Sequence, residues 1–354
     1  MPLLLSEDDV RRVLTMDDCL RSLENSCKQE ELGAAANRTK STIYIRSRSG
    51  LMCQYVSMEG GIRSPAVFAL RLRTHVPTAE QRGPGPERVS MMMLFSGETG
   101  ELLALLKQRV ISSYRVGGMA GLAAREMARP DANVVGIIGS GGLAHAHALA
   151  YAAVRKLEQF KVYSPDAGHR TAFAEWITRM TGVPAEALDN AEAVVRGSDI
   201  VASCTNARVP ILKADWLDQP GVHMTGVQLG NQGELGPEGL KRFQRLVTYL
   251  SGVSIHHNTE PGYRPWMNAT SEGSLGFFKV IPKHHTLTDV LLKKAPGRES
   301  SEERNYFFSE GTGVQFAAVG SVVYSRARER GVGQEMPAEW ANWFLCDNPE
   351  RGSF

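Results

Sequence analysis

The glycine-rich stretch at residues 139–144 carries the clearest chemical signal in the sequence. It reads Gly139-Ser140-Gly141-Gly142-Leu143-Ala144, which fits the pattern G-x-G-x-x-(G/A). In such a stretch the glycines let the backbone come close to a pyrophosphate, and the N–H groups at the start of a helix attract its negative charge. The same pattern of glycines also occurs in ordinary turns between a strand and a helix. The elements on both sides are therefore needed to distinguish a dinucleotide site from such a turn.

The segments on both sides of this stretch support a dinucleotide site. Residues 133–138 form a short apolar run rich in β-branched residues, which is typical of a strand buried on both faces. Residues 145–158 are rich in alanine and predict a helix. Strand, turn and helix follow in the order that the motif requires. The residues predicted to bind the dinucleotide here are Gly139, Ser140, Gly141, Gly142 and Leu143.

The elements farther along the chain predict a doubly wound parallel sheet. Short strands are expected at residues 160–163, 199–205, 222–226 and 245–249, with a helix at 170–180. This alternation is typical of an α/β fold of the Rossmann type.

The first 130 residues have a different pattern. Ser6 and Thr15 each precede acidic residues and predict the starts of two helices. Several β-type segments follow between residues 39 and 106, and residues 112–129 look helical. Arg129-Pro130-Asp131 breaks this last helix and marks a domain boundary.

The C-terminal third is harder to interpret. The region 251–304 contains the pairs His256-His257 and His284-His285, which we expect to lie in loops. Adjacent side chains point in different directions and rarely share a metal ion, so no metal site is predicted. Residues 307–330 predict a long helix with many small residues.

Composition narrows the class of protein. A net charge of +2 gives no indication of a nucleic acid or an anionic membrane as partner. We find no apolar run of the roughly 18 residues that a membrane span needs, and the N-terminus lacks the basic region of a signal peptide. The five cysteines are scattered without a C-x-x-C motif, which favours reduced thiols in a cytoplasmic enzyme.

Five stretches together resemble the ornithine cyclodeaminase/mu-crystallin family. Besides the glycine-rich stretch they are residues 96–104, 111–120, 198–205 and 309–313. No single stretch is highly specific, but the order and spacing of the five stretches together are specific. The resemblance covers nearly the whole chain.

The resemblance implies a two-domain architecture. Residues 1–130, completed by 306–354, would form an α+β domain that binds substrate and makes a homodimer through its β-sheet. Residues 131–305 would form the NAD(P)-binding Rossmann domain. The sequence pattern alone indicates only that the two halves differ.

The resemblance also implies a clamp for the carboxylate of a small α-amino or α-imino acid. Arg38, Arg71 and Arg115 match the positions of the family's basic residues, although family members usually have lysine where Arg71 stands. Guanidinium groups suit this role because their paired donors match the two oxygens of a carboxylate. The alternative is that Arg38 and Arg71 are solvated strand residues.

Two departures from the family pattern bear on the reaction. Ornithine cyclodeaminases have a catalytic aspartate at the position of Gln228, and an amide cannot act as a general base. Arg71 cannot exchange protons at working pH as a lysine can. Arg71 and Gln228 are therefore the catalytic candidates for simple hydride transfer to or from a C–N bond. His223 and Glu234 are candidate proton donors, although structural roles explain both more readily.

The end of the second predicted strand bears on the choice of cofactor. NAD enzymes usually have an acidic residue there, whereas this chain has Ser164, followed by His169 and Arg170. These three residues could receive a 2′-phosphate, which favours NADP over NAD. Asp166 would favour NAD if its side chain turned inward. The resemblance adds further cofactor contacts, namely Thr205, Asn206, Val227 and Gln228.

Three functions stay open at this point. The first is an NAD(P)-dependent oxidoreductase that acts on a small α-imino or α-amino acid. The second is a true ornithine cyclodeaminase, which uses and regenerates NAD within one turnover. The third is a non-catalytic protein that binds a cofactor or small molecule, as in mu-crystallin.

Overall fold

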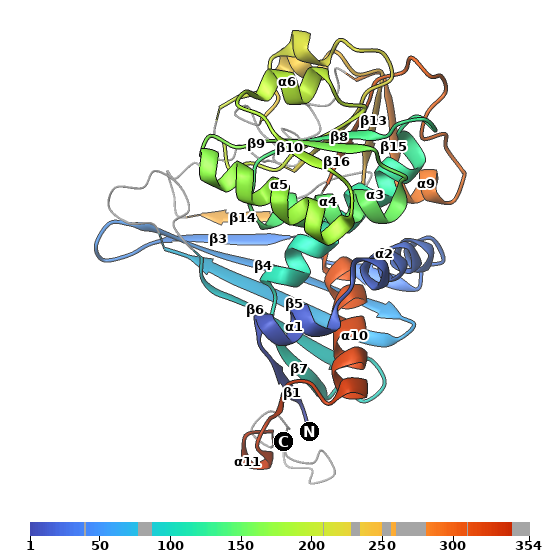
Figure 1. Ribbon diagram of the computed structural model, residues 1–354. Coiled ribbons are helices and arrows are strands. Elements are labelled where there is room, and N and C mark those ends of the chain that lie inside the picture. The colour runs from blue at the N-terminus through green and yellow to red at the C-terminus, as the bar shows by residue number, and fades with distance from the viewer. Residues whose placement is uncertain are drawn as a thin grey trace.

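The computed structural model describes residues 1–38, 40–76, 87–207, 209–227, 234–249, 256–259, 281–309 and 311–341. Figure 1 shows two β-sheets, one above the other, with helices packed between and beside them. Among the described residues, no helix is both long and apolar enough to cross a membrane.

The first sheet contains nine strands in the described part of the chain. Their order is β14-β3-β4-β5-β6-β7-β1-β17, and β2 pairs with β4. The central strands β3 to β7 are joined antiparallel. The bounds are β1 Leu3–Leu5, β2 Ala35–Asn37, β3 Ser41–Arg46, β4 Met52–Arg63, β5 Ala66–His75, β6 Glu87–Ser96, β7 Leu102–Lys107, β14 His256–Thr259 and β17 Gln334–Glu335.

Helices cover one face of this sheet. The long helix α10 packs against β4 and β5, and α2 packs against both α3 and α10. The bounds are α1 Glu7–Val13, α2 Met16–Glu31, α3 Arg109–Met127, α10 Gly313–Arg330 and α11 Ala338–Ala341. The predicted caps are present, since Ser6 accepts a hydrogen bond from the N–H of Asp9 and Thr15 accepts one from the N–H of Asp18.

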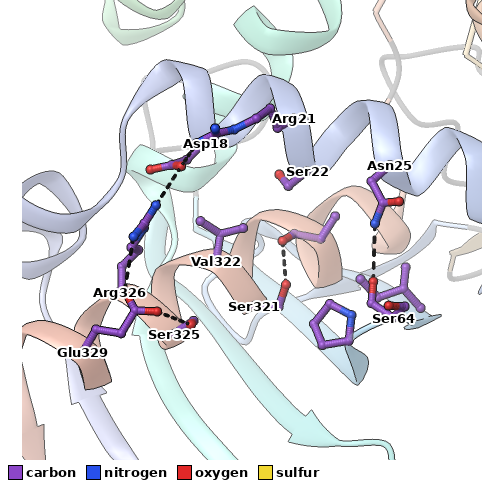
Figure 2. A pocket seen from close by; sticks show the side chains of 13 residues that line it. Asp18, Arg21, Ser22, Asn25, Ser64, Ser321, Val322, Ser325, Arg326 and Glu329 are labelled. Carbon is purple, nitrogen blue, oxygen red and sulfur yellow. Dashed lines mark hydrogen bonds and ion pairs between the residues drawn. The ribbon is translucent and has the colours of Figure 1, made fainter.

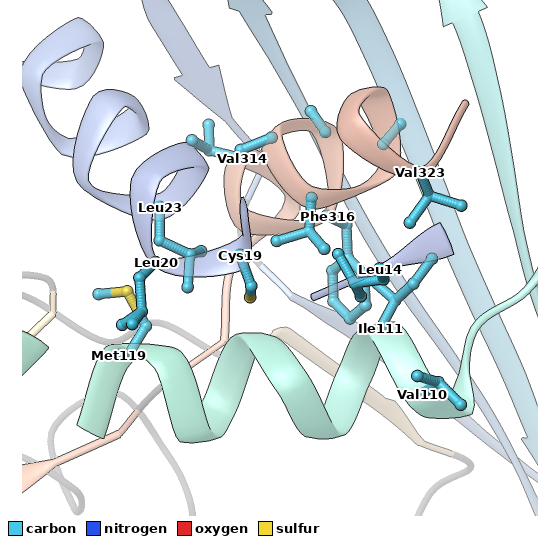
Figure 3. Close-up of a cluster of buried hydrophobic side chains, with 14 of the residues drawn as sticks. Leu14, Cys19, Leu20, Leu23, Val110, Ile111, Met119, Val314, Phe316 and Val323 are labelled. Carbon is cyan, nitrogen blue, oxygen red and sulfur yellow. The ribbon is translucent and has the colours of Figure 1, made fainter. Parts of the chain in front are cut away.

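An apolar core fills the space between α2, α3 and α10. Figure 3 shows these three helices contributing side chains to one cluster. Burial of such side chains stabilises the arrangement by about 1.5–3 kcal/mol each. The labelled members are Leu14, Cys19, Leu20, Leu23, Val110, Ile111, Met119, Val314, Phe316 and Val323.

The second sheet is parallel and has the order β10-β9-β8-β11-β12-β16-β13-β15. Its strands are β8 Val134–Ile138, β9 Gln159–Tyr163, β10 Ala185–Ala187, β11 Ile200–Ser203, β12 His223–Gly226, β13 Arg245–Thr248, β15 Lys283–Thr286 and β16 Asn305–Phe308. The associated helices are α4 Gly142–Val154, α5 Ala167–Thr181, α6 Ala191–Arg196, η1 Ala214–Leu217, α7 Pro237–Leu240 and α9 Leu287–Leu291. The predicted Rossmann-type sheet is confirmed, and its order reverses direction beside β8, where a ligand crevice is expected.

Two predictions about the C-terminal third were wrong. The histidine pairs lie in strands and not in loops, because His256-His257 belong to β14 and His284-His285 to β15. Both strands stand at the end of a sheet, where polar residues are common and the apolar signal of a strand is weak. Residues 305–308 form strand β16 in the sheet interior, whereas the prediction began a helix at 307. A short buried strand and a buried helix start have similar apolar patterns.

The two sheets do not divide the chain at the predicted positions. Strand β14 lies within residues 131–305 but pairs with β3 of the first sheet. Strand β16 pairs with β12 and β13, so the second sheet extends to Phe308. The described cysteines, Cys19, Cys27, Cys53 and Cys204, are free, and Cys346 lies outside the described residues.

Candidate functional site

The glycine-rich turn connects β8 to α4 at the centre of the parallel sheet. Gly139 has a φ of 109°, and a Cβ there would lie 2.5 Å from the carbonyl oxygen of Cys204, so only glycine fits. Gly141 is the N-cap of α4 and provides no side-chain cap for its first N–H groups. A Cβ on Gly141 would meet nothing within 4 Å. The start of α4 is therefore open to an anion such as a pyrophosphate.

The end of β9 lies beside the glycine-rich turn. Ser164 is buried, and its hydroxyl oxygen lies 3.1 Å from that of Ser140 in the glycine-rich turn. Asp166 caps α5 by accepting a hydrogen bond from the N–H of His169 at 2.7 Å. Arg170 donates to the carbonyl oxygens of Ser164 and Pro165 at 3.2 and 3.4 Å. The loop thus places Arg170 beside Ser164 and uses the Asp166 carboxylate for helix capping.

The carboxyl ends of β11 and β12 lie at the same edge of the sheet as the end of β8. The register places Ser203 beside both Ile138 and Gly226, so the three strands end at one edge. Thr205, just after β11, donates from its N–H and its hydroxyl to Oε1 of Glu234, at 2.6 and 2.7 Å. Asn206 is exposed at this edge and Val227 is half-buried, while Gln228 lies outside the described residues.

The two candidate proton donors have structural partners. His223 is fully buried and bonds through Nδ1 to Oδ1 of Asn305 at 2.7 Å. Burial lowers the pKa of His223 to about 3, so the ring is neutral at physiological pH. Glu234 is also buried, and burial raises the pKa of its carboxyl group. Its hydrogen bonds hold Thr205 in place.

Two of the predicted arginines converge on one aromatic ring. The guanidinium carbon of Arg71, from β5, lies 5.6 Å from the ring centre of Phe316, and that of Arg115, from α3, lies 5.0 Å from it. Both arginines are buried, and Nη1 of Arg115 donates to Oε1 of Gln315 at 3.0 Å. Placement over a ring holds each guanidinium in position, and its planar fork of donors matches the shape of a carboxylate.

The chain is shaped to fit the Arg115 side chain. A Cβ on Gly311 would lie 2.2 Å from its Nη1, so a side chain at position 311 would displace the Arg115 guanidinium group. Burial, and next the charge of Arg73, lower the pKa of Arg115 to about 10. Arg115 therefore keeps its positive charge at neutral pH, although it is partly desolvated.

Helix α3 connects Arg115 to the glycine-rich turn. A Cβ on Gly117 would lie 2.6 Å from the carbonyl carbon of Ala146, and one on Gly121 would lie 3.0 Å from Cβ of Ala150. The backbones of α3 and α4 can approach closely because both positions are glycine. A Cβ on Gly142 would lie 3.4 Å from Oγ of Ser113. Arg115 and the turn thus belong to two touching helices.

Arg38 lies apart from this group. Its side chain is 76% exposed and forms an ion pair with Glu59 at 3.0 Å. Glu59 pairs with Leu70 in the sheet, whereas its neighbour Met58 pairs with Arg71, so Glu59 and Arg71 are on opposite faces. The substrate-binding role of Arg38 stays a prediction.

Sequence reasoning missed several residues that build the site. Phe316, Gln315 and Arg73 contact or influence the predicted arginines but belong to no recognised motif. The glycine pair Gly117 and Gly121 could have been noticed, because spacing of four residues puts both on one helix face.

A polar cavity lies between α2 and α10, away from the glycine-rich turn and the arginine pair. Figure 2 shows this cavity, whose volume is about 400 Å³. Arg326 in its wall pairs with Asp18 and Glu329, each at 3.2 Å. Its lining contains none of the residues predicted for the site. Within the described ranges, no group of three or more His, Cys, Asp or Glu residues could hold a metal ion.

Comparison with known proteins gives consistent matches over nearly the whole chain. The sequence profile of the ornithine cyclodeaminase/mu-crystallin family matches residues 1–331. A Delta(1)-pyrroline-2-carboxylate reductase of Bacillus cereus is 26% identical over 337 residues, which cover 94% of this chain and 99% of the relative. An alanine dehydrogenase of Archaeoglobus fulgidus is 28% identical over 336 residues, covering 94% and 98%. The structure of an archaeal alanine dehydrogenase dimer with bound NAD matches with a TM-score of 0.78 at 25% identity, covering 95% of this chain and 99% of the other.

Proposed function

Because the chain belongs to the ornithine cyclodeaminase/mu-crystallin family, we propose that it is an NAD(P)-dependent imine reductase or amino-acid dehydrogenase. It transfers hydride to or from the C–N bond of a small α-imino or α-amino acid. The observation that carries this proposal is the pair of buried guanidinium groups, Arg71 and Arg115, at one ring, with α3 joining Arg115 to the helix that starts at the glycine-rich turn. The reductase and dehydrogenase activities of the relatives support it.

The open start of α4 fits the pyrophosphate of a nicotinamide cofactor. Its N–H groups have no side-chain cap, and the space beside Gly141 is free of protein atoms. The reduced cofactor supplies the hydride when it is bound. The residues proposed to line its site are Gly139, Ser140, Gly141, Gly142, Leu143, Ser164, His169, Arg170, Thr205, Asn206 and Val227, together with Gln228, which lies outside the described residues.

NADP is the preferred cofactor in this proposal. Ser164 stands where an acidic residue would bind the ribose hydroxyls, and Arg170 lies beside it. Asp166, which would favour NAD, is engaged as the cap of α5. A 2′-phosphate would therefore find the guanidinium group of Arg170 nearby.

The protein's own part in the reaction is binding and alignment. Arg71 and Arg115 would hold the substrate carboxylate, so that the imine carbon has one orientation toward the nicotinamide. A protonated imine accepts the hydride at carbon, and the electron pair of the C=N bond becomes the lone pair on nitrogen. This step needs no further general base, which agrees with a glutamine at 228 and an arginine at 71.

A homodimer is part of the proposal. The face of the first sheet opposite α10 has large exposed apolar side chains, namely Ile43, Ile45, Tyr55, Phe68 and Val89. An exposed apolar face of this kind is typical of an interface. A cavity of about 650 Å³, lined in part by Leu4, Met91 and Leu105, lies at its edge. Analytical ultracentrifugation should show a dimer, and Phe68→Glu should shift it toward monomer.

A spectrophotometric assay tests the proposed reaction. We expect net oxidation of NADPH when 2-oxo acids are supplied with ammonia or methylamine, or when cyclic imines are supplied. Release of ammonia from ornithine without net change in cofactor absorbance would instead identify a cyclodeaminase. Cofactor binding without turnover of any imine would identify a non-catalytic binding protein.

A further inference from the structure

The first turn of α10 is capped by a residue from elsewhere in the chain. Its N-cap residue, Thr312, makes no capping hydrogen bond with its side chain. Instead, the N–H of Val314 donates to Oδ1 of Asn37, in β2, at 2.8 Å. The free N–H groups at the start of a helix need such acceptors. A side chain of β2 therefore fixes this turn, and Gln315 and Phe316 follow directly after Val314.

Asn37 is in turn held by a carboxylate. Nδ2 of Asn37 donates to Oε1 of Glu30, near the end of α2, at 2.7 Å. The other oxygen of Glu30, Oε2, accepts a hydrogen bond from the hydroxyl group of Tyr249. A carboxylate only accepts hydrogen bonds and the N–H of Val314 only donates one, so the amide of Asn37 has a single favourable orientation between them.

Tyr249 connects these hydrogen bonds to the parallel sheet. It follows directly after β13, at the carboxyl edge of the sheet, and its side chain is buried. In the register, Thr248 stands beside Phe308, so Tyr249 lies next to the point where the chain leaves β16 toward α10. Helix α2, which carries Glu30, packs against both α10 and α9 (Figure 1). A continuous hydrogen-bonded series therefore runs from Tyr249 at the parallel sheet to the start of α10.

The start of α10 is also where Arg115 is held. Oε1 of Gln315 accepts a hydrogen bond from Nη1 of Arg115 at 3.0 Å, and the ring centre of Phe316 lies 5.0 Å from the guanidinium carbon. A Cβ on Gly311 would lie 2.2 Å from the same Nη1, so the chain packs closely against the guanidinium group. Because packed side chains have little free space, a shift of this turn would move Arg115.

We propose that Tyr249 is a positioning residue, which sets the place of Arg115 relative to the parallel sheet through Glu30, Asn37 and the first turn of α10. This rests on the proposed function for the binding of a substrate carboxylate by Arg115. Tyr249 itself touches neither substrate nor cofactor. The imine carbon has to meet the nicotinamide in one orientation, and small errors of alignment lower the rate strongly. The series therefore aligns Arg115 with the edge of the sheet that begins at the glycine-rich turn.

A double-mutant cycle tests whether Tyr249 acts through Arg115. Tyr249→Phe removes only the hydroxyl group and keeps the packing of the ring. We expect it to raise the KM for an imino acid roughly tenfold, with little change in the affinity for NADPH or in the KM for a matching imine without the carboxylate. In the Arg115→Ala background the same substitution should have almost no further effect on KM. Tyr151→Phe, which removes the hydroxyl group of another fully buried tyrosine, is the matched control and should leave KM unchanged.

Two substitutions at Glu30 add a rescue test. Glu30→Ala breaks the series and should raise the KM for the imino acid as Tyr249→Phe does. Glu30→Gln can preserve the series, because its amide oxygen accepts from Asn37 and its amide nitrogen donates to the hydroxyl oxygen of Tyr249. We expect Glu30→Gln to keep a KM within about threefold of that of the natural chain. A loss in Glu30→Gln as large as that in Glu30→Ala would overturn the series as the cause.

Binding separates this proposal from the proposed function. Titration calorimetry with pyruvate, at saturating NADP, measures the affinity for a carboxylate without turnover. If this affinity falls in Tyr249→Phe and Glu30→Ala but not in Tyr151→Phe, and no imine is reduced, the positioning role stands and the proposed reaction is wrong. If imino acids are reduced but the effects of Tyr249→Phe and Arg115→Ala on KM are additive, the reaction stands and the positioning role is wrong. Unchanged affinity for pyruvate in Tyr249→Phe, or no binding to the natural chain, also overturns the positioning role.

Discussion

In the second sheet the groups expected to hold an anion belong to the backbone, whereas in the first sheet they belong to side chains. The glycine-rich turn offers the N–H groups at the start of α4, within residues 139–144. The first sheet offers Arg71 from β5 and combines it with Arg115 from α3 and Phe316 from α10. A backbone site can be encoded in six consecutive residues, while a side-chain site has to be assembled from distant ones. The first therefore has a sequence motif and the second does not.

The two sites also differ in how much change they tolerate. At the turn, added atoms occupy the space that the ligand needs, so one substitution can block binding outright. At the arginine pair, loss of one guanidinium leaves the other in place, and affinity should fall in steps. Four experiments test this contrast.

Gly141→Asp should have the largest effect and abolish measurable binding of both NADPH and NADH. The new carboxylate would stand at the start of α4, in the space where a pyrophosphate is expected. The protein should still fold, since the φ of −84° at Gly141 suits any residue and its Cβ would meet no protein atom. Titration calorimetry measures the binding, with circular dichroism for the fold and Gly141→Ala as the smaller matched change. Retained affinity in Gly141→Asp would show that the cofactor binds elsewhere.

Arg115→Ala should raise the KM for a carboxylate substrate roughly a hundredfold, because a buried charge-assisted pair is lost. Affinity for the cofactor should change little. Steady-state kinetics should compare an imino acid with a matching imine that lacks the carboxylate. This comparison separates a role in binding the carboxylate from a role in positioning the cofactor. Arg125→Ala, on the same helix but paired with Glu24, is the control. Equal losses for both substrates would mean that Arg115 positions the cofactor instead.

Arg170→Ala should lower the affinity for NADPH about tenfold and leave the affinity for NADH nearly unchanged, because only NADPH carries the 2′-phosphate. Dissociation constants for both cofactors, measured at low salt, give the comparison. If the affinities for both cofactors fall equally, Arg170 maintains the loop through its hydrogen bonds to Ser164 and Pro165 and does not select the cofactor.

His223→Gln should have the smallest effect on activity and a clear effect on the pH dependence of stability. Burial depresses the pKa of His223 from its ordinary value to about 3. Below about pH 6.5 the unfolded chain therefore binds a proton that the folded chain does not, and stability falls by about 1.4 kcal/mol per pH unit until the folded pKa is reached. Urea unfolding between pH 7 and pH 5 should show a shallower fall in the variant. An unchanged slope, or a shifted pH profile of kcat, would contradict a purely structural His223.

Local features of this protein were predictable from the sequence. The caps at Ser6 and Thr15, the turn at Gly139 and the central parallel strands all depend on neighbours within a few residues. Their physical causes, namely hydrogen bonding of helix ends, left-handed backbone and continuous apolar runs, act over short distances. Arg71 and Arg115 were identified as candidates through the resemblance to a family, and the structure then brought their guanidinium groups to one ring.

Other features depended on tertiary structure. Whether His256-His257 form a strand depends on pairing with β3, some two hundred residues earlier in the chain. Whether residues 305–308 begin a helix or fill a gap between β12 and β13 depends on the whole sheet. The proximity of Arg73 to Arg115, and the exposure of Arg38, follow from which face of a strand meets α10. Sequence sets the local backbone preferences, but contacts between distant residues form only when the packed core fixes register and face.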